Sequence, residues 1–344
     1  MKKIDSAANA FGLDVGTSRV VFAENTISEE IKFSTQLNAF MSVPFSELTE
    51  ASLKNANINY QCVDNEIFVF GNDSAKFANF FNVETRRPMQ KGILNPYEKH
   101  GMMIMHTIID RLVKPNKVNN SIPFCFSVPG PSPAAGLDTN LIFHEGMIKS
   151  HLNKLGYAKV EAVNEGLAVI LSELSEDNFT GIGISCGGGM CNICMSYLSL
   201  PVLKYSHLKA GDYIDVNVGS VTGEKATRIQ TIKEESLDLS REPRDKTEKA
   251  FHIYYGDVII SLIDSFKKAL RDLKNIPKIE KSIPIVLAGG TAKPTGFRDR
   301  FEKELKKSNM PIDISEVRLA EDPLNTTVRG MLVAASSSAH KKKE

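Results

Sequence analysis

The sequence predicts a two-lobed α/β protein built from a duplicated unit, and three observations lead to this prediction. At 344 residues and 37.9 kDa, the chain is too long for one ordinary hydrophobic core. Segments typical of strands and helices alternate along it, as in an α/β layered core. Each half also opens with an apolar hairpin that is interrupted by glycine, at residues 11–22 and 181–195, which indicates an internal duplication.

The first hairpin consists of an apolar strand, a tight turn at Asp14-Val-Gly-Thr17 and a second strand over 20–22. Gly16 lets the backbone approach a ligand closely, and successive N–H groups with the hydroxyls of Thr17 and Ser18 can form an anion-binding concavity. The Asp14 carboxylate suits a hydrated divalent cation. An ordinary hairpin explains the same residues, so both interpretations are open at this point.

After this hairpin, period-two alternation predicts a strand over 31–41. Residues from about 42 to 84 are mixed in character and predict a small insertion with a short strand pair. A loop over 86–96 precedes the first amphipathic helix. The elements predicted next are a helix over 97–113, a buried strand over 122–129, a helix over 139–155, a strand over 160–164 and a helix over 165–174.

The second half repeats this pattern after its hairpin, whose turn is the triple glycine Gly187–Gly189. A third strand over 201–208 continues the meander, and the charged stretch 236–249 predicts a loop or an edge hairpin. The other elements predicted are helices over 211–235, 251–273, 297–306 and 326–336, and strands over 283–291 and 314–318.

Composition excludes several functions. Hydrophobic residues at 42% and charged residues at 24% are ordinary, and the net charge of +1 gives no reason to expect nucleic acid as a partner. The chain has no apolar run of 18 residues, and residues 1–10 have neither the apolar core of a signal sequence nor the stripe of an interfacial anchor. We therefore expect a cytoplasmic protein without direct membrane insertion. A solvated terminus explains the basic tail, 340–344, at least as well as a docking segment.

Three of the five cysteines, Cys186, Cys191 and Cys194, have a spacing that forms part of an iron–sulfur pattern. The other two, Cys62 and Cys125, are far away in the sequence. An odd number of cysteines fits a reducing compartment, and cysteine in an apolar strand behaves as a small core residue. We therefore expect core positions rather than a metal cluster.

Five separate motifs together resemble those of the superfamily of actin, sugar kinases and heat-shock chaperone ATPases. In chain order they resemble the first phosphate, first connecting, second phosphate, adenosine and second connecting motifs. They are Asp14-Val-Gly-Thr17, Asn164-Glu-Gly-Leu-Ala-Val-Ile170, Ser185-Cys-Gly-Gly-Gly189, Ala288-Gly-Gly-Thr291 and Asp322-Pro-Leu-Asn-Thr-Thr-Val-Arg-Gly330.

Within the superfamily, Arg87-Pro-Met-Gln-Lys-Gly-Ile93 is similar to a segment of actin and of the bacterial actins of the MreB and MamK type. The resemblance implies a two-lobed actin-like fold, a duplicated ribonuclease-H-like unit, with a nucleotide cleft between the lobes and two small subdomain insertions. Domain I would comprise 1–164 plus 322–344, with an insertion of about 42–84. Domain II would comprise 165–321, with an insertion of about 209–280.

The resemblance also implies roles for individual residues, with ATP or ADP and Mg²⁺ as cofactors. Asp14 would organise the magnesium hydration shell, and Glu165 would orient the attacking water, which makes these two the catalytic candidates. A carboxylate favoured by the helix dipole is the alternative for Glu165, and a solvated charged face is the alternative for Lys233 and Glu234. The remaining nucleotide-binding candidates are Gly16, Thr17, Ser18, Gly187, Gly188 and Gly189 for the phosphates, Gly289, Gly290 and Thr291 for adenine and ribose, and Lys233 and Glu234 for ribose and base.

The second phosphate motif departs from the pattern of the superfamily, because Ser185 stands where an aspartate is usual and Met190-Cys-Asn192 follows the glycines. Hydrolysis of a nucleotide depends on metal-assisted positioning. We therefore expect nucleotide binding with slow hydrolysis, a weak ATPase. The sequence does not distinguish ATP from GTP.

Three functions fit these features. The first is a filament-forming, actin-like protein whose ATP hydrolysis times disassembly and whose main partner is a second copy of itself, with adaptor proteins of an organelle or cargo as further partners. The second is a small-molecule kinase of the same fold. The third is a catalytically weakened, nucleotide-gated adaptor that does not polymerise.

Overall fold

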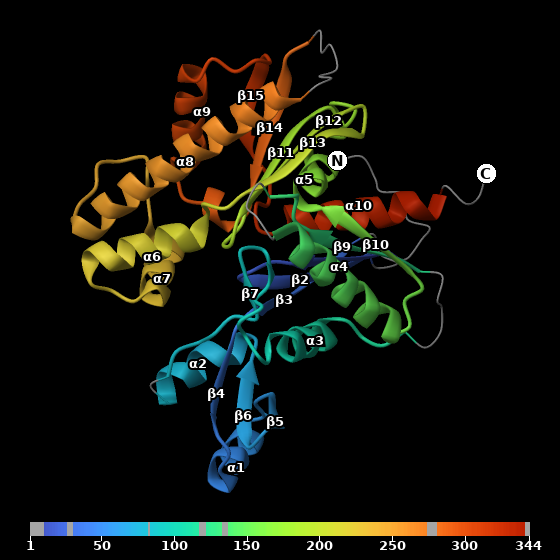
Figure 1. Ribbon diagram of the computed structural model, residues 1–344, viewed down its shortest axis with the longest axis vertical. Coiled ribbons are helices and arrows are strands. Elements are labelled where there is room, and N and C mark those ends of the chain that lie inside the picture. The colour runs from blue at the N-terminus through green and yellow to red at the C-terminus, as the bar shows by residue number, and fades with distance from the viewer. Residues whose placement is uncertain are drawn as a thin grey trace.

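The computed structural model describes residues 10–25, 30–81, 83–116, 122–132, 137–273 and 281–340. The N-terminal residues 1–9 and the end of the basic tail, 341–344, lie outside the described residues. The described chain forms two lobes, each built on a five-stranded sheet flanked by helices (Figure 1). This confirms the two-lobed α/β prediction.

The first sheet has the order β10-β9-β1-β2-β3. Strands β1 to β3 form an antiparallel meander, and β9 and β10 are parallel to β1. Apolar side chains fill the buried positions of β1 and β2, which is why these short segments form the centre of the sheet. The strands are β1 (Phe11–Val15), β2 (Arg19–Asn25), β3 (Ile31–Leu37), β9 (Pro123–Val128) and β10 (Lys159–Asn164).

The second sheet repeats this topology in the order β13-β12-β11-β14-β15. Again three antiparallel strands are followed by two parallel ones. The repeat confirms the internal duplication. The strands are β11 (Gly181–Cys186), β12 (Cys191–Tyr197), β13 (Leu200–His207), β14 (Ile283–Ala288) and β15 (Ile314–Leu319).

Two helices, α5 (Glu165–Glu173) and α10 (Thr326–His340), pack against each other and join the lobes. Helix α5 lies on β11 and β12, whereas α10 returns from the end of the chain to lie on β1 and β9 (Figure 1). Glycine permits this close approach, because a Cβ on Gly330 would collide with the carbonyl of Ala168 and a Cβ on Gly183 would collide with that of Gly166.

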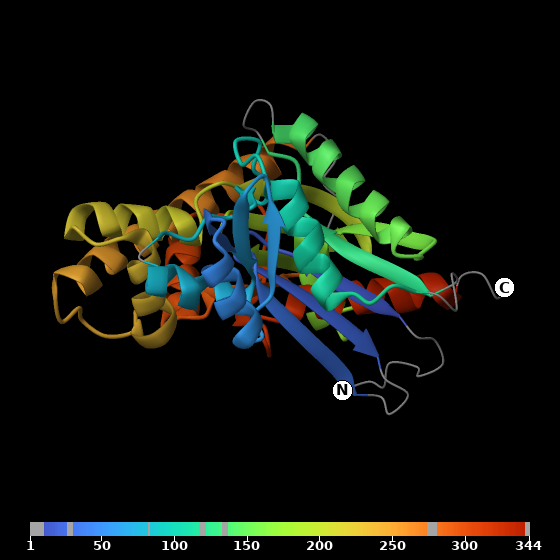
Figure 2. The ribbon, with the colours of Figure 1, turned by 90° about the horizontal axis from the view of Figure 1, so that it is seen from below.

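The outer faces of the sheets are covered by longer helices. Helices α3 (Gly101–Leu112) and α4 (Leu137–Lys154) cover the first sheet, where Ile108 and Ile148 pack with Phe124. Helices α8 (Lys246–Asp272) and α9 (Phe297–Lys307) cover the second. Seen from below, α6 to α8 project on the opposite side of the molecule from α4 and α10 (Figure 2).

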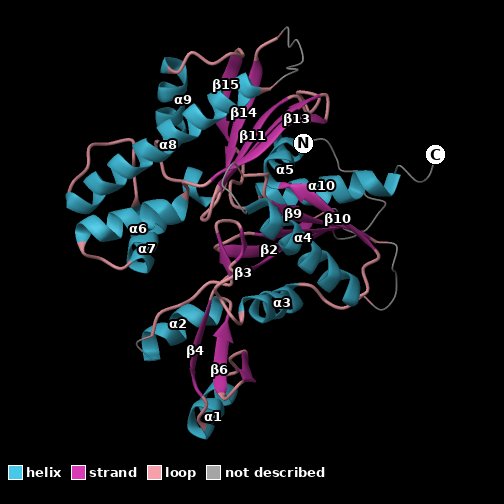
Figure 3. Ribbon diagram, in the orientation of Figure 1, coloured by secondary structure: helices cyan, strands magenta, loops and turns pink. Residues whose placement is uncertain are grey.

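A small subdomain extends from the first lobe (Figure 3). Its three-stranded sheet contains β4 (Phe40–Pro44), β5 (Tyr60–Val63) and β6 (Glu66–Phe70), flanked by α1 (Glu47–Asn55) and α2 (Asn72–Phe81). The single strand predicted over 31–41 is therefore wrong. The chain leaves the first sheet at the buried Asn38, whose side-chain amide donates to the carbonyl of Gly16 at 2.9 Å, and enters the small sheet at Phe40.

The helix predicted over 211–235 is two helices, α6 (Gly211–Thr222) and α7 (Ala226–Ser236). Gly223, at φ 80°, adopts the left-handed conformation that ends α6. The charged stretch that follows is a loop rather than a hairpin, and α8 begins after its cap, Asp245.

Short elements complete the fold, namely the ladder of β7 (Met89–Gln90) with β8 (Ile93–Leu94) and the 3₁₀ turn η1 (Gly290–Ala292). Among the described residues, no helix combines the length and the apolar character needed to cross a bilayer.

Candidate nucleotide cleft

The turn between β1 and β2 carries the first group of predicted site residues. The N–H of Gly16 donates to the carbonyl of Arg19 at 3.0 Å, which closes the turn. A Cβ on Gly16 would lie 2.9 Å from that carbonyl oxygen, so glycine is needed for the tight geometry. The Thr17 hydroxyl accepts a hydrogen bond from the N–H of Gly92 at 3.0 Å, which fixes the turn against the β7–β8 segment.

The turn between β11 and β12 faces the first turn from the other lobe. The N–H of Gly187 donates to the carbonyl of Met190 at 3.0 Å and closes this turn in the same way. A Cβ on Gly188 would collide with the Ser18 hydroxyl, and one on Gly189 would collide with the Thr17 hydroxyl. A Cβ on Gly189 would also lie 2.8 Å from the backbone nitrogen of Gly92, so the close approach of the two lobes requires glycine at this position.

Backbone N–H groups in both turns are unpaired. Within the described residues, those of Thr17, Ser18, Gly188 and Gly189 donate to no protein acceptor. Unpaired N–H groups gathered in a turn form a concavity that binds anions. Two such concavities from opposite lobes fit a polyphosphate.

Two carboxyl groups lie beside these turns, the partly buried Asp14 and the buried Glu165. Asp14 accepts a hydrogen bond from the Ser127 hydroxyl at 2.8 Å, and that hydroxyl also accepts from the N–H of Val15 at 2.8 Å. Glu165, at the start of α5, lies 3.3 Å from the Ser185 hydroxyl, which donates to it.

Burial raises the pKa of Asp14, although the Ser127 hydrogen bond opposes the shift. Burial and then the negative charge of Asp14 raise the pKa of Glu165, against hydrogen bonds from Asn192 and Ser185. Within the described residues, no basic side chain contributes to either shift, so the cleft holds two carboxyl groups that repel each other when both are ionised. A hydrated divalent cation would relieve that repulsion, so the residues fit Mg²⁺.

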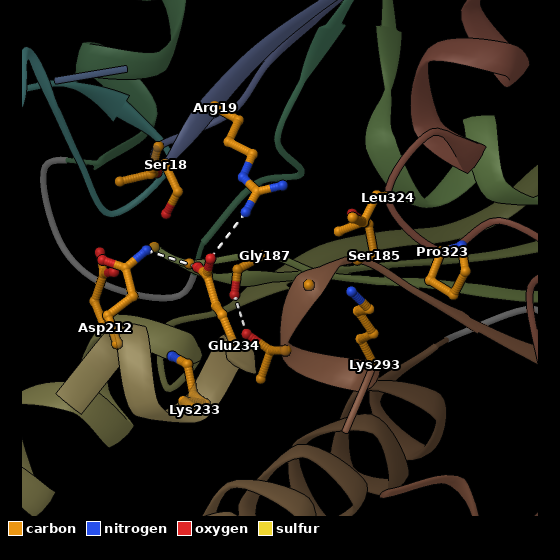
Figure 4. A pocket seen from close by; sticks show the side chains of 18 of the residues that line it. Ser18, Arg19, Ser185, Gly187, Asp212, Lys233, Glu234, Lys293, Pro323 and Leu324 are labelled. Atoms are coloured by element: carbon orange, nitrogen blue, oxygen red, sulfur yellow. Dashed lines mark hydrogen bonds and ion pairs between the residues drawn. The ribbon is translucent and has the colours of Figure 1, made fainter. Parts of the chain in front are cut away.

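The other end of the cleft is formed by η1, α7 and the segment before α10. Gly289, at φ 90°, makes the turn after β14, and the Thr291 hydroxyl donates to the carbonyl of Gly187 at 2.7 Å. Pro323, Leu324 and Lys293 lie together here (Figure 4).

The two charged residues predicted on α7 occupy different environments. Lys233 is buried, forms an ion pair with Asp215 at 2.7 Å and donates to the carbonyl of Gly211 at 3.2 Å. Glu234 reaches the opposite lobe and forms an ion pair with Arg19 at 2.9 Å (Figure 4). A fully solvated face is therefore excluded for Lys233, whereas Glu234 is half-exposed.

The structure brings every predicted site residue to one cavity of about 610 Å³, within the usual range for small-molecule sites. The cavity lies between the lobes, since residues of both sheets line it. The predicted residues along its wall are Asp14, Gly16, Thr17, Ser18, Glu165, Gly187, Gly188, Gly189, Lys233, Glu234, Gly289, Gly290 and Thr291.

Sequence reasoning missed several residues of this site. Arg19 and Asp212 line the cavity, and Ser127 holds Asp14 from the neighbouring strand β9. Ser127 had a detectable signal, since it is a polar residue near the end of an otherwise apolar buried strand. Arg19 and Asp212 had none, because their partners are distant in the sequence.

The cysteines do not converge on a metal. All five are free thiols. Cys186 and Cys191 face each other across the β11–β12 ladder in the core beneath α8, whereas Cys194 packs in a different cluster, with α5. Within the described residues, no three histidine, cysteine or acidic side chains are grouped so that they could hold a metal ion by themselves.

Comparisons with known proteins agree with this geometry. The model of the family described as Volactin matches residues 9–335. A search among curated proteins found no match.

Three solved structures are similar over nearly the whole chain. The MamK double helical filament has a TM-score of 0.71 at 16% identity, with 96% of this chain and 99% of that chain covered. MreB 5 of Spiroplasma citri bound to AMPPNP has a TM-score of 0.67 at 13% identity, with 98% of each chain covered. The ethanolamine utilization protein EutJ from Carboxydothermus hydrogenoformans has a TM-score of 0.55 at 13% identity, with 95% of this chain and 90% of that chain covered. These likenesses confirm the actin-like fold.

Proposed function

The chain belongs to the Volactin family, and from this premise we propose that it is an actin-like cytoskeletal protein that binds ATP with Mg²⁺ between its lobes and polymerises into cytoplasmic filaments. One observation carries the proposal: two glycine turns with unpaired N–H groups face each other across the cleft, next to the carboxyl groups of Asp14 and Glu165. The filament part is supported by the similarity to the MamK double helical filament.

We assign the roles in the cleft as follows. The turns at Gly16–Ser18 and Gly187–Gly189 would hold the β- and γ-phosphates from opposite lobes, and Asp14 would hold the water shell of Mg²⁺. The bound cation would neutralise charge on the phosphates. Glu165, at the start of α5, would orient the attacking water. At the other end, Gly289, Gly290 and Thr291 would contact adenine and ribose, together with Lys233 and Glu234.

Hydrolysis would be slow, because Ser185 is a neutral hydroxyl next to Glu165. Loss of one positioned electrostatic group lowers rates by about 10²–10³-fold in other enzymes. The same observation favours a second candidate function, a nucleotide-gated adaptor that binds partner proteins without polymerising. In both functions the bound nucleotide bridges the lobes.

We also propose that the domains divide as the sequence predicts, with 1–164 and 322–344 in domain I and 165–321 in domain II. The two separate sheets support this division, and so does the packing of α10 against β1 and β9. The small sheet β4–β6–β5 supports an insertion over about 42–84, and helices α6 to α8 support one over about 209–280.

Sedimentation with Mg-ATP, with a non-hydrolysable analogue and without nucleotide, followed by electron microscopy of the pellets, tests the proposal. We expect filaments with both nucleotides, with slower disassembly for the analogue. Nucleotide binding without polymer at high protein concentration would instead establish the adaptor.

Asp14→Ala tests the assignment of the metal. We expect about a hundredfold or greater loss of affinity for Mg-ATP, because truncating one partner of a buried charge contact costs about 2–5 kcal/mol. Isothermal titration measures the loss. Asp257→Ala is the matched control, since Asp257 pairs with Lys209 outside the cleft. Wild-type affinity in Asp14→Ala would remove Asp14 from the site.

A further inference from the structure

Two adjacent arginines, Arg86 and Arg87, point to different lobes. Arg86 stays in the first lobe, where its N–H donates to the carbonyl of Phe40 at 2.7 Å and its guanidinium lies 4.6 Å from the centre of the Phe40 ring. Its side chain also donates to the Ser42 hydroxyl at 2.9 Å. The two backbone hydrogen bonds between Arg86 and Phe40 anchor the peptide that carries Arg87 to the small sheet, whereas the Arg86 side chain makes its contacts within the first lobe.

Arg87 crosses to the second lobe. One nitrogen of its guanidinium donates to Asp212 at 2.6 Å and another donates to the side-chain carbonyl of Gln230 at 2.8 Å. The side chains of Arg87 and Asp212 are only 26% and 34% exposed. A planar guanidinium with two fixed acceptors is a pre-organised contact that a single ammonium group does not reproduce.

Asp212 connects this contact to the second glycine turn. It lies in the first turn of α6, and its N–H donates to the carbonyl of Gly188 at 2.8 Å. One of its carboxylate oxygens, the acceptor of the Arg87 bond, lies 3.2 Å from the position of a Cβ on Gly188. Any movement of Asp212 therefore acts on the turn that faces Ser18.

We infer that Arg87 is a positioning residue, which from the first lobe holds Asp212 and thereby keeps the Gly187–Gly189 turn closed over the polyphosphate. This inference rests on the proposed nucleotide binding. Release of nucleotide requires the turns to separate, and separation breaks the contact between Arg87 and Asp212. The ion pair of Arg19 with Glu234 is a second contact across the same cleft, and substitution of Arg87 would leave it in place.

The rate at which a fluorescent ATP analogue dissociates with Mg²⁺ present, measured by stopped flow after addition of excess ATP, tests the inference. We expect Arg87→Ala to raise the dissociation rate about tenfold or more, because loss of a partly buried charge pair acts mainly on dissociation. Arg86→Ala, the adjacent control, should leave the rate unchanged. Arg87→Lys, which keeps the charge but not the double contact, should give an intermediate rate.

A double-mutant cycle separates positioning from general destabilisation. If Arg87 acts through Asp212, the double variant that combines Arg87→Ala and Asp212→Ala should release the nucleotide no faster than the faster of the two single variants. Additive effects would overturn the inference, and so would unchanged rates in Arg87→Ala and Arg87→Lys while the wild-type chain binds nucleotide. Failure of the wild-type chain to bind nucleotide would overturn both the inference and the proposed function. Thermal melting without nucleotide verifies folding, and Arg87→Lys decides the outcome where Arg87→Ala does not fold.

Discussion

At the scale of single residues, the neutral side chain of Ser185 limits the negative charge in the cleft. It is buried on β11 and donates to Glu165 at 3.3 Å. It occupies the position where an aspartate is usual in the actin and sugar-kinase superfamily that the motifs resemble. A hydroxyl adds no charge beside Glu165, whose pKa is already raised by burial and by Asp14. The chain thereby avoids a third carboxylate beside Asp14 and Glu165, and on our proposal it loses one group that would order the magnesium shell.

Ser185→Asp should increase phosphate release with Mg-ATP by about tenfold or more if the missing carboxylate limits hydrolysis. Without Mg²⁺ the same variant should melt at a lower temperature, because the added carboxylate repels Glu165. A phosphate-release assay and thermal melting measure the two effects. Ser185→Asn, similar in size but uncharged, is the control. An unchanged rate in folded Ser185→Asp would place the limit elsewhere.

Some residues of the site could be predicted from their neighbours in the sequence, and others could not. The turns at Gly16–Ser18 and Gly187–Gly189 could be predicted, because glycine and hydroxyl residues between apolar strands carry their signal within a few positions. Arg87 could not, because its partner Asp212 is more than a hundred positions away, and Ser127 stood out only as a polar residue in an apolar strand, with nothing to identify Asp14 as its partner. Residue type alone gives no information about such partners.

At the scale of elements, the start of α8 depends on one carboxylate. Glu248 accepts hydrogen bonds from the guanidinium of Arg241 at 2.8 Å and from that of Arg244 at 2.6 Å, in the turn that follows the Asp245 cap. These hydrogen bonds hold the pKa of Glu248 well below its usual value of 4.5. They also fix the charged loop onto the helix.

Glu248→Gln should reduce the free energy of unfolding at neutral pH by about 1–2 kcal/mol, because it removes hydrogen bonds to a charged group. Because folding lowers the pKa of Glu248, the contribution of its hydrogen bonds to the free energy of unfolding is fully present above pH 4.5. This contribution is lost as the pH falls through the pKa of Glu248 in the folded state. Urea unfolding at neutral pH and at about pH 3 measures the difference from wild type.

The surface variant Glu302→Gln is the control for this comparison. It removes an exposed ion pair with Lys306 on α9 and should change stability by less than about 0.5 kcal/mol. Equal effects of the two substitutions at neutral pH would contradict the assigned role of Glu248.

Local patterns predicted most elements but not every boundary. The hairpins and buried strands were predictable because β-branched and apolar runs are bounded by glycine and proline. The break between α6 and α7 was missed because helical periodicity continues past Gly223, although its backbone is left-handed. The end of β3 was missed because the alternation of residues continues into β4, which belongs to another sheet.

At the scale of the whole molecule, the two lobes present repelling carboxyl groups to a shared cleft. Asp14 comes from the first sheet, and Glu165 comes from the helix that joins the lobes. Contacts across the cleft, such as those of Arg19 and Arg87, hold the lobes together against this repulsion. A bound cation would turn the repulsion into a further connection between the lobes.

The pH dependence of unfolding tests this arrangement. Because burial raises the pKa of Asp14 and of Glu165, the folded state binds protons that the unfolded chain releases above about pH 4. In the ligand-free protein, their contribution to stability therefore falls as the pH rises. Asp14→Asn removes one of these groups, so its stability relative to wild type should increase with pH, as measured by urea unfolding.

Mg-ATP at a hundredfold excess over its dissociation constant should stabilise wild type by about 2.7 kcal/mol and should stabilise Asp14→Asn much less. Asp257→Asn, outside the cleft, should keep the response of wild type to Mg-ATP. Parallel pH profiles for Asp14→Asn and wild type would show that folding does not raise the pKa of Asp14.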